Sequence, residues 1–248
     1  MHPQHEVDEV LRLIGEGLND CQISRATGTS RTTIREWRRF GPPGRRVGRG
    51  TRGCPRCDGR SLDEPAYAYL LGLYLGDGYI SRDPRTYRLR IFQDERYPHL
   101  IKLARRTVAR VREVEEQRVG IVHGEGCVAV SAHWNHWPCL FPQHGAGMKH
   151  QRPINLADWQ LEIVHRYPRQ MLRGLIHSDG CRVMNRVWQG KYSYPRYFFT
   201  NVSGDIRQIF RDVCDVIRVP HRDSRWDTIS IARRDGVAAL DAFIGPKA

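Results

Sequence analysis

The 248-residue sequence lacks any apolar run long enough to cross a membrane. Its longest uncharged apolar stretch, residues 66–76, is about half as long as a bilayer crossing requires. The first residues also lack the cationic and then apolar pattern of a secretory signal. We therefore expect a cytoplasmic protein without a transmembrane helix.

Lysine and acidic residues are both scarce. Only four residues are Lys, so 36 of the 40 basic residues are Arg; the 27 Asp and Glu leave a net charge of +13. A polyanionic partner is the first hypothesis. Hydrophobic residues at 40%, with six Trp, supply enough apolar area for a core, which excludes a wholly disordered basic tail.

The basic charge is concentrated in residues 31–60, which hold ten Arg against Glu36 and Asp58 and are rich in Gly and Pro. Such a segment is typical of a flexible linker that seeks phosphates, or of a solvated tether. The chain is predicted to have four parts: a small domain over 1–40, a linker over 41–60 and, from the internal repeat described below, two larger parts over 61–165 and 166–248.

Three short helices are predicted within residues 1–40. Apolar residues between positions 7 and 14 recur at spacings of three and four. Asp20 is suited to cap a second helix and Ser30 a third, with Gly28 in the turn between them.

The third predicted helix has an outward basic face. Five of its side chains are able to reach phosphates or base edges in a major groove: Arg31, Thr32, Thr33, Arg35 and Arg38. This segment resembles the helix-turn-helix domains of bacterial regulators and resolvases over about 35 residues. The alternative is a small helical bundle with a solvated basic face.

An internal repeat is the most informative feature. Residues 70–78 (LLGLYLGDG) and 172–180 (LRGLIHSDG) match at five of nine positions, and their Asp residues, Asp77 and Asp179, lie 102 positions apart. Each copy has small residues four apart, which form a smooth stripe on a helix and favour close packing of the two helices. Gly78 and Gly180 are expected to end these helices in the left-handed conformation.

A carboxylate at a helix C-terminus faces the negative end of the helix dipole, so two such residues need a reason beyond structure. We expect the two Asp to lie side by side at the end of the helix pair, with a divalent cation between them. A few hard oxygen ligands, completed by water and substrate phosphate, are the pattern that Mg²⁺ prefers. Such a centre activates water and stabilises charge on a phosphodiester.

These two segments resemble the signature helices of LAGLIDADG homing endonucleases in their single-chain form. The resemblance implies an α+β core: a pseudo-two-fold pair of αββαββα subdomains with antiparallel saddles that bind double-stranded DNA. It implies a monomer with internal pseudo-dimer symmetry. It also implies that Asp77 and Asp179 bind Mg²⁺ with backbone oxygens of Gly76 and Ser178. An earlier acidic residue of the signature is replaced here by Leu75 and His177.

The segments that follow each Asp repeat one predicted order of strand, helix, strand and helix. The predicted strands are residues 87–91, 127–131, 196–202 and 228–232; the predicted helices are 97–111, 134–141, 205–217 and 235–244. Arg88, Arg90, Arg196 and Thr228 alternate along these strands and are candidates for the DNA-binding face.

Two lysines also lie at similar distances after the two repeated Asp residues. Lys149 follows Asp77 by 72 residues and Lys247 follows Asp179 by 68. Members of the resembled family often have a Lys near each metal site, which implies a catalytic role for Lys149 and Lys247. The alternative is that both are ordinary solvated lysines.

Cys54 and Cys57 have the spacing of one zinc knuckle, and no second CxxC exists to complete four ligands. Two interpretations remain: the pair binds a structural Zn²⁺ ion, or the two cysteines are reduced thiols in an ordinary turn. The nearest groups of further ligands are His133, His136, Cys139 and His144. We interpret these four as packing and polar surface.

The function that follows is a metal-dependent, homing-type endonuclease that hydrolyses phosphodiester bonds in both strands of a long DNA site. The alternative is a non-cleaving transcriptional regulator with a LAGLIDADG-like fold and a helix-turn-helix. An intein remnant is disfavoured because the sequence has no terminal Cys or Ser nucleophile and no His-Asn ending.

Overall fold

The computed structural model describes residues 4–41, 53–188 and 191–245. The chain divides into two compact units, Met1–Gly53 and Cys54–Ala248. No helix in the described part of the chain is both long and apolar enough to span a bilayer. Lys247 and most of the Arg-rich linker lie outside the described residues.

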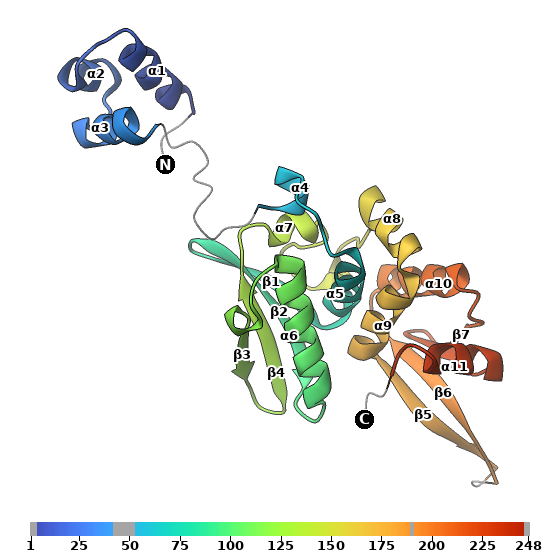
Figure 1. Cartoon of the computed structure of the whole chain (residues 1–248). Coiled ribbons are helices and arrows are strands. Elements are labelled where there is room, and N and C mark those ends of the chain that lie inside the picture. The colour runs from blue at the N-terminus through green and yellow to red at the C-terminus, as the bar shows by residue number, and fades with distance from the viewer. Residues whose placement is uncertain (1–3, 42–52, 189–190, 246–248) are drawn as a thin grey trace. The chain divides into compact units, whose positions relative to one another are not determined.

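The N-terminal unit consists of three helices, α1 (Gln4–Gly15), α2 (Asp20–Thr27) and α3 (Arg31–Phe40) (Figure 1). Its core is formed by six buried apolar residues: Val7, Val10, Leu13, Ile23, Ile34 and Trp37. Ile34 and Trp37 are the inward side chains of α3. In α1, Leu13 is buried, whereas Leu11 and Ile14, two of the recurring apolar residues, lie at the margin of this core.

The helix ends of this unit differ from the prediction at one position. Ser30 caps α3, and Gly28 ends α2 in the left-handed region with φ of 74°, both as predicted. The residue that caps α2, however, is Asn19 and not Asp20. Asn19 accepts hydrogen bonds from the main chain of Cys21 and Gln22, and the Gln22 side chain accepts from the Asn19 N–H, which completes a capping box.

The second unit contains the predicted αββαββα order twice. The first half runs through α5 (Glu64–Asp77), β1 (Gly78–Asp83), β2 (Thr86–Asp94), α6 (Pro98–Arg112), β3 (Gly120–His123), β4 (Cys127–His133) and α7 (Trp137–Leu140). The second runs through α9 (Pro168–Asp179), β5 (Gly180–Val187), β6 (Tyr192–Thr200), α10 (Gly204–Val216), β7 (Arg222–Arg225), β8 (Thr228–Ile231) and α11 (Arg234–Asp241). The short helix α4 (Pro55–Asp58) precedes the first half, and α8 (Asp158–Arg166) lies between the halves.

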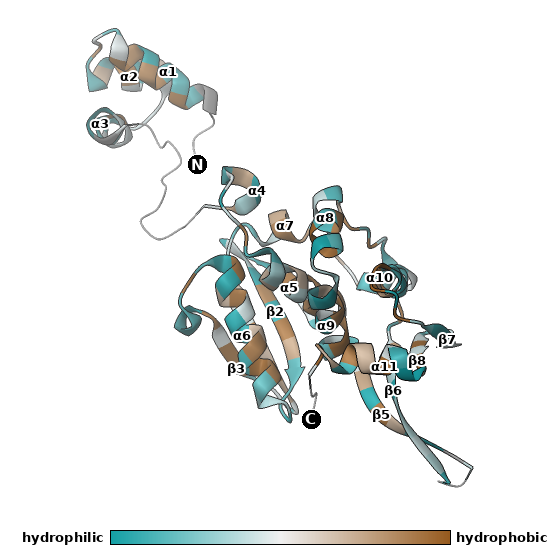
Figure 2. Cartoon of the chain, turned by 45° about the vertical axis from the view of Figure 1, so that its right-hand side comes forward, coloured by the Kyte–Doolittle hydropathy of each residue, from teal (hydrophilic) through white to brown (hydrophobic). Residues whose placement is uncertain are grey.

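The two sheets have the same topology. Their strand orders are β1-β2-β4-β3 and β5-β6-β8-β7, and every neighbouring pair is antiparallel. Gly78 pairs with Ile91 in the first sheet and Gly180 with Phe199 in the second, so the two registers are equivalent. In Figure 2, hydrophobic residues lie along β2, whereas the edge strand β7 is hydrophilic. The α+β fold with two equivalent halves is therefore confirmed.

Helices α5 and α9 pack against each other between the two sheets (Figure 1). A Cβ added to Gly174 would lie 2.3 Å from the Tyr69 carbonyl oxygen, and one added to Gly72 would lie 2.5 Å from the Met171 carbonyl oxygen. These distances leave no room for a methyl group. The small residues thus permit the backbone contact that the repeat predicts.

The expected left-handed ends of these two helices are wrong. Gly78 and Gly180 are extended, with φ of −90° and −102°, because β1 and β5 begin at these residues. Glycine is required there by space. A Cβ on Gly78 would lie 2.4 Å from the Tyr74 Cα, and one on Gly180 would lie 2.7 Å from the Ile176 Cα.

Candidate metal centre and nucleic-acid interface

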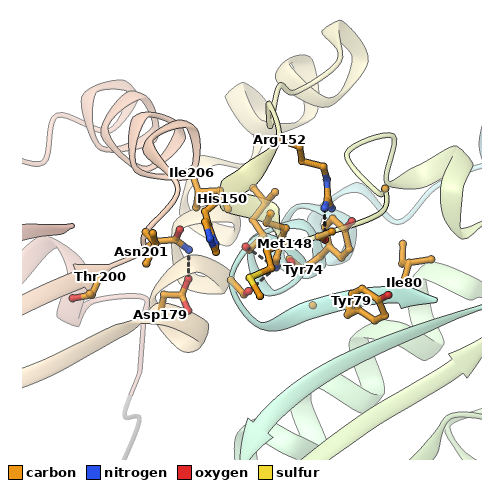
Figure 3. A pocket seen from close by; sticks show the side chains of 17 residues that line it. Tyr74, Tyr79, Ile80, Met148, His150, Arg152, Asp179, Thr200, Asn201 and Ile206 are labelled. Carbon is orange, nitrogen blue, oxygen red and sulfur yellow. Dashed lines mark hydrogen bonds between the residues drawn. The ribbon is translucent and has the colours of Figure 1, made fainter. Parts of the chain in front are cut away.

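The C-terminal ends of α5 and α9 border two clefts. The larger, of about 500 Å³, is lined by Asp179, Gly76, Lys149, His150 and Asn201 among others (Figure 3). The smaller, of about 270 Å³, is lined by residues that include Asp77, Ser178, Gln93 and His177. Each cleft therefore contains one of the two repeated acids, so the expectation of a single cation between both acids is wrong.

Each acid lines a cleft together with a residue of the other helix. Asp179 of α9 shares its cleft with Gly76 of α5, whereas Asp77 of α5 shares its cleft with Ser178 of α9. A Cβ on Gly76 would lie only 3.0 Å from the Asp179 carboxyl carbon, so this carboxyl group lies against the last turn of the neighbouring helix. Each cleft is thus built from one acid and the residue that precedes the other acid.

Lys149 lies at the C-terminal end of α5. Its Nζ donates hydrogen bonds to three carbonyl oxygens of the last turn, those of Tyr74, Leu75 and Gly76, at 2.7, 2.8 and 2.5 Å. A cation at this end of a helix is favoured by the dipole. Burial lowers the pKa of Lys149 to about 8, although Asp179 and Asp77 act in the opposite direction. Lys149 is therefore not an ordinary solvated lysine.

Asn201 directly follows β6 and orients Asp179. Its Nδ2 donates to the Asp179 carboxylate at 2.5 Å, and its Oδ1 accepts from the Ser203 main chain at 2.8 Å (Figure 3). The second bond fixes which end of the amide faces Asp179. Gln93, which lines the Asp77 cleft, is the equivalent residue in the first sheet, since both lie two positions after the partner of the helix-terminal glycine.

Gln93 and Asn201 were not predicted as site residues. The available signal was weak: Gln93 is a polar residue near the end of β2, and Asn201 directly follows β6. Their equivalence depends on strand register, and a shift of one residue would turn each side chain to the opposite face of its sheet.

The donor groups of the larger cleft fit Mg²⁺. They are the Asp179 carboxylate and the Gly76 main-chain carbonyl, both hard oxygen ligands, in an open cleft with room for water and phosphate. In the smaller cleft the corresponding groups belong to Asp77 and Ser178. The Ser178 hydroxyl donates to carbonyls of its own helix, so we infer that its main-chain carbonyl is the group offered to a metal.

Three candidate DNA-binding arginines lie on equivalent outward faces of the sheets. Arg88 and Arg90 alternate with the buried Leu89 and Ile91 in β2, and Arg196 alternates with the buried Tyr197 in β6. Arg88 donates to the Ser131 hydroxyl at 2.7 Å and Arg90 to that of Ser81 at 3.0 Å. Thr228 is buried, and its hydroxyl is hydrogen-bonded to that of Thr200.

The candidate residues of α3 divide into two groups. Arg31, Thr32 and Arg35 are exposed, although Arg31 donates to the Cys21 sulfur at 3.6 Å and Arg35 pairs with Asp20 at 3.5 Å. Thr33 is half-buried beside Ser30, the cap of the helix. Arg38, although exposed, is bonded to Asp20 and to the Leu18 carbonyl, at 3.1 and 2.6 Å. The guanidinium of Arg38 therefore holds α3 to the start of α2.

The cysteine pair of the predicted zinc knuckle has close neighbours. The ligand atoms of Cys54, Cys57, His136 and Cys139 all lie within 4.8 Å of one another. The interpretation of His136 and Cys139 as packing and polar surface therefore misses this cluster. His133 and His144 lie elsewhere: His133 pairs with Asp83, and His144 packs on the ring of Tyr87.

No family model and no curated protein matches the sequence. Solved structures with a similar fold include I-DmoI in complex with DNA and Mn, at 18% identity and a TM-score of 0.45, covering 74% of this chain and 98% of that one. The LAGLIDADG meganuclease I-AabMI bound to uncleaved DNA has 11% identity and a TM-score of 0.44, covering 71% and 82%. The N-terminal LAGLIDADG domain of DUF199/WhiA has 12% identity and a TM-score of 0.43, covering 74% and 82%.

Within this chain, the repeated helices pack through Gly72 and Gly174, and each is followed by an equivalent four-stranded antiparallel sheet. The Cys54–Ala248 unit is thus an internally duplicated α+β fold.

Proposed function

We propose that this chain is a site-specific, homing-type endonuclease that cuts both strands of double-stranded DNA with Mg²⁺. The observation that carries the proposal is the pair of clefts at the ends of two tightly packed helices, each lined by one acid, Asp77 or Asp179, and by a residue of the other helix. A net charge of +13 and arginines on the outward face of each sheet supply the attraction to phosphate.

In the larger cleft, Asp179 and the Gly76 carbonyl would hold the metal, and Asn201 keeps the carboxylate in place through its fixed amide. Bound Mg²⁺ supplies a Lewis acid that activates water and stabilises charge on the scissile phosphate. Lys149 fixes the last turn of α5 and thereby the Gly76 carbonyl. Asp77 and Ser178 have the corresponding roles in the smaller cleft.

We assign the N-terminal unit the role of a second DNA-binding domain of the helix-turn-helix type. The exposed basic side chains of α3, together with the Arg-rich linker, are the basis of this assignment. Arg38 donates to both Asp20 and a main-chain carbonyl, whereas Arg35 makes one longer contact with Asp20, at 3.5 Å, and its side chain is 73% exposed. We therefore expect Arg31, Thr32 and Arg35 to make the principal contacts.

Selection from a randomised duplex DNA library tests the proposal. Incubation with Mg²⁺ should yield cleaved molecules that share one sequence, whereas Ca²⁺ should yield bound but uncut molecules of the same sequence. Enrichment of one uncut sequence in both metals would instead support the non-cleaving regulator.

Lys149→Met is expected to reduce cleavage by at least about 10-fold, because the Gly76 carbonyl loses its charged donor; such bonds are worth about 1.5–3 kcal/mol each. DNA affinity in Ca²⁺ should stay unchanged. Single-turnover cleavage measures the first quantity and a filter-binding titration the second. Lys102→Met, on the exposed face of α6, is the matched control. Cleavage by Lys149→Met at the wild-type rate would remove the role assigned to this residue.

Arg35→Ala is expected to weaken binding to specific and non-specific DNA alike and to reduce the slope of log affinity against log salt by about 1, as loss of one phosphate contact requires. The measurement is a titration by fluorescence anisotropy at several salt concentrations. Arg12→Ala removes the same charge from α1, where the guanidinium is bonded to Glu9 and Glu16, and should leave the slope unchanged. Equal slopes for Arg35→Ala and the wild type would argue against contact by α3.

A further inference from the structure

Three cysteines and a histidine from distant parts of the sequence meet at the start of the second unit. Cys54 directly precedes α4 and Cys57 lies within it; His136 directly precedes α7 and Cys139 lies within it. The Cys57 sulfur lies 3.5 Å from the Cys139 sulfur and 3.6 Å from the His136 Nδ1, and the last two atoms are 3.8 Å apart.

These three distances match one face of a metal-sized tetrahedron, and the Cys54 sulfur lies within 4.8 Å of each of the three atoms. With Zn–S bonds of about 2.3 Å and Zn–N bonds of about 2.0–2.1 Å, tetrahedral geometry requires S···S separations of about 3.8 Å and S···N separations of about 3.6 Å. A disulfide, by contrast, would require the two sulfurs to approach to about 2.05 Å. The cluster therefore matches the spacing of a zinc site.

The surrounding structure holds the four ligands in position. Each pair has the i, i+3 spacing of a short turn; the Cys54 N–H donates to the Asp58 carboxylate at 2.6 Å, and the Cys139 N–H to the His136 carbonyl at 3.1 Å. The Trp137 indole N–H donates to the Ala132 carbonyl at 2.9 Å, which fixes α7 to the end of β4. The ligands are thus oriented by contacts that do not depend on a metal.

We propose that Cys54, Cys57, His136 and Cys139 bind a structural Zn²⁺ ion. Four protein ligands fill a tetrahedron and leave no position for water or substrate, so the site is structural and not catalytic. It lies in a different part of the fold from the two acid clefts, which are lined by oxygen donors and not by any of these four residues.

The site explains how α4 stays in place. This helix has four residues and none of its helical positions is buried, so apolar packing gives it little support. It packs on α7 (Figure 1), and Arg56 lies over the Trp159 ring at 4.6 Å. A zinc ion would link the first residue of the second unit to a segment about 80 positions later, which leads on to Lys149. The ion thus anchors the point where the Arg-rich linker joins the core.

Metal analysis and cobalt spectroscopy of the full-length protein test this proposal. We expect purified wild-type protein to contain one zinc per chain by mass spectrometry, and Cys127→Ala, which alters a half-buried cysteine of β4, to contain the same amount. Cys57→Ala and Cys139→Ala should bind zinc more than about 100-fold more weakly, since even outer-shell changes cost 10–100-fold.

Because the Cys57 and Cys139 variants can fail to fold, the wild-type protein provides a second measurement. Titration of chelator-treated protein with Co²⁺ should give the intense visible bands of a tetrahedral, thiolate-rich site. Absence of these bands, equal zinc content in wild type and Cys139→Ala, or a Cys57–Cys139 disulfide in the purified protein would overturn the proposal. Neither readout involves DNA, so failure of the nuclease proposal would leave this one intact.

Discussion

Asp77→Asn and Asp179→Asn are each expected to lower Mg²⁺-dependent cleavage of one DNA strand by at least about 10²-fold, the range found when a single charge-stabilising group is removed. The two variants should fail on opposite strands, because the acids line separate clefts. The amide is the same size as the carboxylate but lacks the charge that holds a divalent cation. DNA binding in Ca²⁺ should change little.

The measurement is cleavage of a duplex labelled differently on its two strands. Asp212→Asn removes an exposed carboxylate from α10 and should cut both strands at the wild-type rate. If either Asp77→Asn or Asp179→Asn also cuts both strands normally, the metal-binding role of that residue is wrong. If each variant fails to cut either strand, both carboxylates are essential for cleavage, but the two clefts do not act independently.

Gly174→Ala should destabilise the second unit by about 3 kcal/mol, the upper end of the usual overpacking cost. Its new methyl group would lie 2.3 Å from the Tyr69 carbonyl oxygen and 3.0 Å from the Gly72 Cα. Both are backbone atoms, so no flexible side chain relieves the clash and the two helices must separate.

Urea unfolding measures this effect as a shift of the midpoint at constant m-value. Gly204→Ala, at the start of α10, is the matched control: its added Cβ would meet only a guanidinium nitrogen of Arg207, at 3.9 Å. That variant should be as stable as the wild type or slightly more stable, since alanine restricts the unfolded chain. Equal stability of Gly174→Ala and the wild type would contradict the close packing of α5 and α9.

The sequence predicts many of the helices and strands in which buried apolar residues recur at regular spacing. Helices α6 and α10 and the strands β2, β4, β6 and β8 all bury several apolar residues and were predicted. None of the four edge strands, β1, β3, β5 and β7, was predicted from the pattern of residues. All four residues of β3 and all four of β7 are exposed, which leaves these two strands no alternating pattern. Their positions depend on pairing with β4 and β8, which is a tertiary interaction.

The candidate site divides in the same way. Asp77 and Asp179 were predicted as candidate metal ligands because the repeat that contains them can be read directly from the sequence. Asn201 and Gln93 were missed because their equivalence depends on strand register. The left-handed conformation expected at Gly78 and Gly180 was wrong because each strand begins at the glycine itself, so the backbone there is already extended.

The Cys/His cluster was found only in part from the sequence. Cys54 and Cys57 form a recognisable pair, but His136 lies 79 residues beyond Cys57, and no local pattern signals that distance. The cluster exists because α4 packs on α7, whose position is fixed by the core beneath Trp137.

The most direct test of the central claim is the location of Mn²⁺ by anomalous diffraction from crystals of this protein with its selected DNA. We predict one peak between the Asp179 carboxylate and the Gly76 carbonyl, and another between the Asp77 carboxylate and the Ser178 carbonyl. Each metal–oxygen distance should be close to the roughly 2.1 Å typical of small divalent cations. If the DNA is bound next to these helices but neither cleft contains a metal peak, the assignment of Asp77 and Asp179 as the catalytic metal ligands is contradicted.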